Sequence, residues 1–206
     1  MELNNYTKKK LTIDLVKANS LGCSLFLPVS LFYIAPFLLL WLDDFSGSSI
    51  KQFLTSVFES LVSGYGLLPI VLFVGGIVLH ELIHGITWSF FAKGGHKAIK
   101  YGILKKMLTP YCHCKEPLKL RAYILGAMMP ALLLGLLPGI IAIATGSIGM
   151  LLFAIFFTMA AAGDFMIIQL LWKQDPDSMV LDHPSEAGCY IYIPNQPEDA
   201  KGTEES

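Results

Sequence analysis

Residues 67–91 read LLPIVLFVGGIVLHELIHGITWSFF, an apolar stretch that holds two histidines and one glutamate. It exceeds the roughly 20 apolar residues that a helix needs to cross the hydrocarbon core of a bilayer. Ionisable side chains are rare in such stretches and mark functional sites there. On a helix, positions i and i+4 share one face, so His80 and His84 can bind one metal ion with Glu81 beside them. The stretch therefore predicts a membrane helix that carries part of a metal site.

The composition of the whole chain agrees with a membrane location. Of 206 residues, 54% are hydrophobic and 15% are charged, and the mean hydropathy is +0.58. This balance excludes a single soluble domain of this length. The stretches long and apolar enough to span a bilayer are residues 21–42, 67–91, 120–145 and 147–172. We therefore predict an all-α polytopic membrane protein with four transmembrane helices.

The basic residues are distributed unevenly along the chain. Lysines precede the first stretch, and a second basic cluster runs from Lys93 to Arg121, whereas segment 43–66 carries only Lys51. By the positive-inside rule, both termini and segment 92–119 are predicted to be cytoplasmic in a multi-pass cell-membrane protein. The basic loop contains no nucleic-acid-binding motif, so the lipid bilayer is the expected partner and nucleic acid is not.

Short elements are predicted outside the spans. Residues 12–18 favour an interfacial helix, and the apolar spacing over 50–61 favours an amphipathic helix. Residues 98–113 suggest a small β-hairpin at the cytoplasmic surface, and 189–193 suggest a strand. The predicted organisation is a cytoplasmic segment (1–20), a four-span membrane domain (21–172) and a cytoplasmic tail (173–206) that is partly disordered beyond Pro194.

A third metal ligand is predicted from depth in the membrane. Catalytic zinc typically has three protein ligands and an open position. Besides Glu81, Asp164 is the carboxylate within the predicted spans, and it lies about as far from the cytoplasmic end of its span as His84 does. We predict that His80, His84 and Asp164 hold Zn²⁺ and that Glu81 is the general base of a metal-assisted hydrolysis. The alternative is that these groups are satisfied by hydrogen bonds without a metal.

Two further histidine motifs are ambiguous. Cys112-His113-Cys114 offers zinc-ligand chemistry, but its spacing is shorter than the C-x₂₋₄-C of closed structural sites, so a surface turn is favoured, with His113 at the mouth of the site as an alternative. His183, in Asp182-His183-Pro184, either belongs to a turn or lies in a tail folded over the site. The cysteines are expected to be free thiols, because most fall on the predicted reducing side.

With HELIH on one span and Gly163-Asp164 on a later one, the chain resembles a bacterial family of membrane zincin peptidases related to the site-2 intramembrane metalloproteases. The resemblance covers roughly residues 75–188 and includes the stretches 110–114 and 182–188. It implies that His80, His84 and Asp164 bind zinc and that Glu81 is the catalytic acid/base. The sequence departs from the Leu-Asp-Gly context usual in site-2 proteases.

The resemblance implies a zinc-dependent peptidase that cleaves a membrane protein or peptide within or beside the bilayer. The hairpin over 98–113 would offer an edge strand to an extended substrate. The alternative is a non-catalytic metal-binding membrane protein, either an adaptor or transporter-like. A transport pathway needs polar residues across the whole membrane, and few lie outside the predicted cytoplasmic half, which favours the peptidase.

Overall fold

The computed structural model describes residues 5–42, 51–52, 54–56, 58–59, 67–104, 109–184 and 186–195. Of the amphipathic helix predicted over 50–61, residues 51–52, 54–56 and 58–59 are described and are helical, and the others lie outside the described residues. The predicted disorder of the tail also falls almost entirely outside them, beyond residue 195.

Three predicted spans are confirmed as helices long and apolar enough to cross a membrane: Cys23–Trp41, Leu67–Ser89 and Leu120–Thr145. The first belongs to α1 (Leu15–Trp41), the second is α3 (Leu67–Ser89), and the third joins α4 (Leu120–Pro130), η2 (Ala131–Leu136) and α5 (Leu137–Thr145). In the first two, only 17% and 22% of the most apolar window is buried, so most of these apolar side chains face outward. Outward-facing apolar side chains are what a lipid environment favours.

The predicted fourth span is broken. It consists of α6 (Ile148–Ala160) and α7 (Ala162–Leu171), which bend by 43° at the break, so the described helices give three spans, or four if this pair counts as one. Ala161 has φ −77° and ψ 8°, outside the helical region, and ends α6. Asp164 consequently lies in the first turn of α7, where the helix dipole favours a carboxylate.

The chain divides into two compact units. The first, here called the site unit, comprises Met1–Asn19, Ile83–Met129 and Gly163–Ser206; the second, the span unit, comprises Ser20–Leu82 and Pro130–Ala162. Helix α3 runs without interruption from Leu82 in the span unit to Ile83 in the site unit. Side chains on this helix therefore keep helical spacing across the boundary.

The span unit is held together by apolar packing with a few satisfied polar groups. Its buried cluster contains Tyr33, Phe37, Ala142, Leu151, Ala154 and Ile155. Within it, the Tyr33 and Thr158 hydroxyls lie 2.9 Å apart, and Trp41 Nε1 donates to the Ile143 carbonyl at 2.8 Å. Buried tyrosine and tryptophan need such partners, because an unpaired polar group in an apolar interior is costly.

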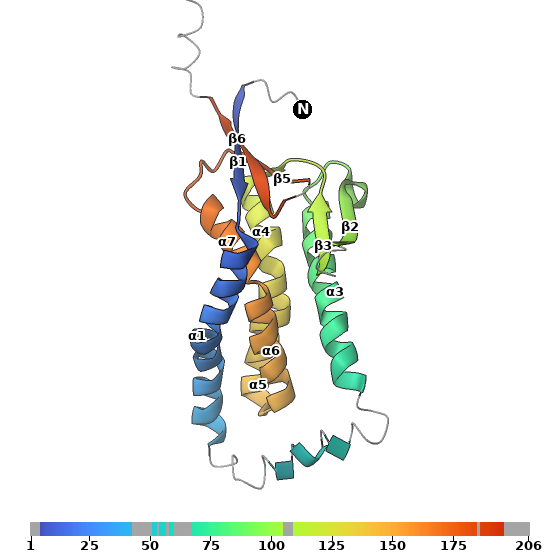
Figure 1. Cartoon of the computed structure of the whole chain (residues 1–206), viewed down its shortest axis with the longest axis vertical. Helices are drawn as coiled ribbons and strands as arrows, with labels where there is room; N and C mark the ends of the chain where they lie inside the picture. Colours follow the sequence, from blue (N-terminus) through green and yellow to red (C-terminus); the bar gives the residue numbers. More distant parts are fainter. Residues whose placement is uncertain are drawn as a thin grey trace, which may run out of the picture. The chain divides into compact units, whose positions relative to one another are not determined.

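The site unit contains a four-stranded antiparallel sheet that the sequence analysis did not predict (Figure 1). Its order is β1 (Tyr6–Thr12), β6 (Gly188–Pro194), β5 (Met179–Asp182) and β4 (Leu118–Lys119). The strand predicted at 189–193 is confirmed within β6. The helix predicted over 12–18 is wrong at its start, because residues up to Thr12 pair with β6 and α1 begins at Leu15. That pairing joins the two ends of the chain, which local sequence patterns do not reveal.

The predicted hairpin is confirmed as a two-stranded antiparallel sheet (Figure 1). Strand β2 (Ile99–Leu104) pairs with β3 (Thr109–Cys114), with Ile99 opposite Cys114 and Leu104 opposite Thr109. At its base, Lys115 N donates to the Ala98 carbonyl at 2.8 Å. The hairpin belongs to the site unit, whose buried cluster includes Ile99, Cys114, Trp88, Tyr123 and Val180.

Candidate metal centre

Helices α3 and α7 bring together the three predicted ligands. His80 and His84 lie one turn apart on α3, and Asp164 lies at the start of α7. One ligand atom from each residue can be chosen so that all three lie within 4.8 Å of one another. His80 is 8% exposed and His84 is 4% exposed, so both imidazoles are buried. Among the described residues, no other group of three metal-binding side chains has its ligand atoms this close together.

The orientation of His84 is fixed by the backbone of α4. Its Nδ1 lies 2.8 Å from the Gly126 carbonyl oxygen. Because a carbonyl only accepts, Nδ1 carries a hydrogen and donates it, and Nε2 is the nitrogen left to face Asp164. This arrangement, in which the second imidazole nitrogen is held by a hydrogen bond, is typical of histidine metal ligands.

The distance between His84 and Asp164 fits a metal ion between them. Nε2 of His84 and Oδ1 of Asp164 are 3.3 Å apart. This is longer than the about 2.7–2.9 Å of a charged hydrogen bond. Two ligands that are each about 2.0–2.1 Å from a tetrahedral zinc ion are about 3.3 Å apart. In a neutral His84, the two facing lone pairs would repel each other, so a cation between them stabilises this geometry.

Two aromatic rings stack in series on the His84 ring. The His84 ring stacks on Trp88 at a centroid distance of 5.1 Å, and Trp88 stacks on Tyr123 at the same distance. Trp88 Nε1 also donates to the Tyr123 carbonyl at 3.0 Å. A methyl group at Gly126 would overlap the Trp88 indole, so only glycine lets α4 approach closely enough for its carbonyl to reach His84.

Asp182 anchors the far end of this stack. Its Oδ1 accepts a hydrogen bond from the Tyr123 hydroxyl at 2.5 Å, and its Oδ2 accepts one from Cys114 N at 2.7 Å. Burial raises the pKa of Asp182, while the bonds from Tyr123 and Cys114 and the nearby His113 act in the opposite direction. A buried carboxylate with two donors thereby joins β5, α4 and β3.

Replacing Asp182 by asparagine is expected to destabilise the fold by about 1–3 kcal/mol at neutral pH. The asparagine side chain has one acceptor oxygen, so its amide would face either the Tyr123 hydroxyl or Cys114 N and leave a buried donor unpaired. Thermal unfolding in detergent micelles, followed by circular dichroism, measures the effect. The exposed Asp177→Asn is the matched control. An unchanged midpoint for Asp182→Asn would show that these two bonds do not stabilise the fold.

The Cys112-His113-Cys114 stretch does not form a second group of converging ligands in the described structure. It lies in β3, where neighbouring side chains point to opposite faces, so His113 cannot meet both cysteines. His113 Nδ1 lies 4.0 Å from Asp182 Oδ2 instead. Burial raises the pKa of Cys114 to about 11, and its Sγ donates to the Glu116 carbonyl at 3.3 Å. The surface-turn interpretation is also corrected, because the stretch is a strand.

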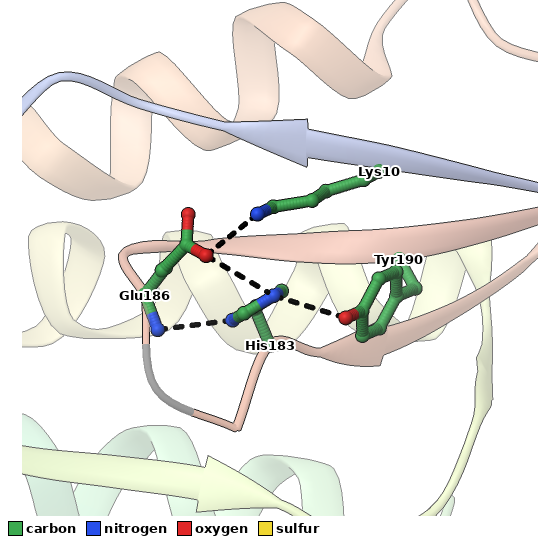
Figure 2. Close-up of polar contacts among 4 residues, drawn as sticks. All are labelled: Lys10, His183, Glu186 and Tyr190. Atoms are coloured by element: carbon green, nitrogen blue, oxygen red, sulfur yellow. Dashed lines mark hydrogen bonds and ion pairs between the residues drawn. The ribbon is translucent and has the colours of Figure 1, made fainter.

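His183 closes the turn between β5 and β6 (Figure 2). Its Nδ1 accepts from Glu186 N at 3.0 Å, so Nε2 carries the hydrogen in the neutral ring and faces the Tyr190 hydroxyl at 3.0 Å. Glu186 also pairs with Lys10 of β1 at 2.6 Å, and this lowers the pKa of Glu186. The turn interpretation of His183 is therefore supported. His96 is exposed and lies in the short helix η1 (Gly95–Ala98).

Several residues around the ligands were missed from the sequence. Trp88 lies four residues after His84, so helical spacing alone would have placed it against the site. Gly126 acts through its carbonyl and its lack of a side chain, and span glycines commonly serve other packing roles. Asp182 was noted only as part of a turn. Its bonds to α4 and β3 depend on contacts distant in sequence.

Comparison with known proteins gives a family match that covers the candidate site. The model of the DUF3267 family, described as "Putative zincin peptidase", matches residues 73–179, which include all three proposed ligands and Glu81. Comparisons with curated proteins and with solved structures gave no match. The matched region runs from α3 to the first residue of β5.

Proposed function

The chain belongs to the DUF3267 family, whose model is described as "Putative zincin peptidase", and on this premise we propose that it hydrolyses a peptide bond within or beside the membrane. His80, His84 and Asp164 would hold Zn²⁺. The observation that carries the proposal is the 3.3 Å approach of His84 Nε2 to Asp164 Oδ1. His84 lies on α3, which is long and apolar enough to span a bilayer, and Asp164 lies on α7, which meets that test only together with α6. A pair at this distance, with His84 buried and the Asp164 side chain 24% exposed, fits a metal site better than a structural ion pair.

Bound zinc would polarise the scissile carbonyl and acidify water. Glu81 follows His80 directly on α3 and is partly exposed. In the proposed reaction, its carboxylate takes a proton from the attacking water as the new C–O bond forms. It then passes that proton to the amide nitrogen as the C–N bond breaks, so the products are a carboxylic acid and an amine. The Gly126 carbonyl keeps His84 in one tautomer throughout.

The proposed substrate is a membrane protein or a peptide at the membrane. The distribution of lysine and arginine favours cytoplasmic termini and a site nearer the cytoplasmic face. Strands β2 and β3 form a sheet of two strands, so each has an outer edge in the described structure. An extended peptide can pair with such an edge through main-chain hydrogen bonds.

A chelation experiment tests this proposal. The purified protein in detergent micelles is expected to contain zinc and to cleave members of a fluorescence-quenched peptide library. Cleavage should stop when 1,10-phenanthroline removes the metal and return when Zn²⁺ is added. Cleavage that persists after elemental analysis shows the zinc to be gone would contradict the proposal. Failure of the zinc-loaded protein to cleave the library would favour the non-catalytic metal-binding alternative.

A further inference from the structure

Helix α3 presents two adjacent rows of residues to the site. His80 and His84 form one row, and Glu81 and Gly85 form the next, rotated by about 100° around the helix axis. If Glu81 takes a proton from the attacking water, that water must lie on the side of the histidine row where Glu81 stands. The reacting centre therefore lies beside the row formed by Glu81 and Gly85.

The hairpin places a hydroxyl over this same row. Ile99 and Tyr101 are two residues apart along β2, so their side chains lie on the same face of the strand. A methyl group at Gly85 would overlap the Tyr101 hydroxyl and would lie 2.8 Å from Cγ2 of Ile99. Strand β2 therefore packs directly against the backbone of α3 at Gly85, immediately after the ligand His84.

The direction of this contact places the Tyr101 hydroxyl on the side of the proposed reacting centre. A Cα–Cβ bond in an α-helix tilts toward the N-terminus, so the hydroxyl at the missing Cβ of Gly85 lies on the side of Glu81. Tyr101 is 42% exposed, whereas Gly85 is buried. The ring thus has its hydroxyl at the helix and much of its remaining surface open to a bound chain.

We infer that Tyr101 is a catalytic residue whose hydroxyl donates a hydrogen bond to the oxyanion that develops from the scissile carbonyl. This inference rests on the proposed peptidase function. Hydrolysis of an amide moves charge onto the carbonyl oxygen, and a preorganised donor stabilises that charge most in the transition state. A phenol can donate such a bond while its ring packs beside Ile99. Replacing Tyr101 by phenylalanine removes the hydroxyl and keeps the ring, so this variant separates hydrogen bonding from ring packing.

The test compares Tyr101→Phe with Tyr111→Phe on the library peptide that the wild type cleaves fastest. For Tyr101→Phe, we expect kcat to fall by about 10²–10³-fold, with KM little changed and zinc content equal to that of the wild type. Tyr111 is the matched control, because it lies in the same hairpin with its hydroxyl against Gly102 of β2 rather than against α3. We expect Tyr111→Phe to keep the wild-type kcat.

Binding of a phosphinic peptide of the same sequence gives a second measurement. Its tetrahedral group imitates the transition state, so Tyr101→Phe should weaken its binding by about the same factor as it lowers kcat/KM. Gly85→Ala should displace the hydroxyl and lower kcat too.

The possible results separate this inference from the proposed function. Wild-type kcat in Tyr101→Phe, together with an inactive Glu81→Gln, would overturn the role of Tyr101 and leave the peptidase intact. Loss of zinc or of folding in Tyr101→Phe would assign the hydroxyl a structural role and would also overturn the inference. A wild-type protein that cleaves no library peptide would overturn both.

Discussion

Replacement of Glu81 by glutamine is expected to lower peptide cleavage by about 10²–10⁴-fold while zinc remains bound. Glutamine has nearly the shape of glutamate but cannot accept and release the proton of the attacking water at neutral pH. The proposed ligands are His80, His84 and Asp164, so the metal site itself is left unaltered. Cleavage of the quenched peptide and zinc content by elemental analysis should be measured on the same preparation.

Glu186→Gln is the matched control for this variant. Glu186 is a carboxylate of the same chain that pairs with Lys10 on the surface of the site unit, outside the ligand group. We expect it to cleave at the wild-type rate. Full activity of Glu81→Gln would contradict a general-base role for Glu81. Loss of zinc in Glu81→Gln would instead indicate that the glutamate helps to hold the metal.

The convergence of the three candidate ligands could be predicted because it depends on regular periodicity. His80 and His84 are four residues apart on an uninterrupted helix, and Asp164 was found by counting residues along a second span. The count succeeded although that span is broken at Ala161, because the break lies before Asp164 and leaves the short distance to the end of α7 helical. The geometry of the three ligand atoms thus agrees with an argument that used only length.

The four-stranded sheet and the groups that hold His84 in place could not be predicted, because they do not depend on regular periodicity. Pairing of β1 with β6 joins residues near both ends of the chain, and the exposed lysines of β1 carry no apolar alternation that would indicate a strand. Gly126 contributes a backbone oxygen, for which residue type gives no signal. Tyr101 reaches α3 only because β2 folds against Gly85. Such contacts depend on tertiary packing, which overrides local preference.

Replacement of Asp164 by alanine is also expected to have a large effect. It should lower zinc affinity by more than the factor of about 10–100 that follows loss of an outer-shell partner. Asp164 would supply the charged ligand; its Oδ1 faces Nε2 of His84 at 3.3 Å, and its side chain is 24% exposed. Without it, two neutral imidazoles on one helix would remain as the protein ligands. Competition with a zinc-binding dye measures the affinity directly and needs no substrate.

Asp164→Asn distinguishes coordination from a simple ion pair. If Asp164 binds zinc, the asparagine oxygen can still occupy the ligand position without the charge, so its affinity should fall between those of the wild type and Asp164→Ala. Asp177→Ala, an exposed acidic residue beyond the end of α7, should bind zinc as the wild type does. Wild-type affinity in Asp164→Ala would remove this residue from the ligand set. Asp164 would then serve only as a partner of His84, and the zinc would require a third ligand from elsewhere in the chain or from the substrate.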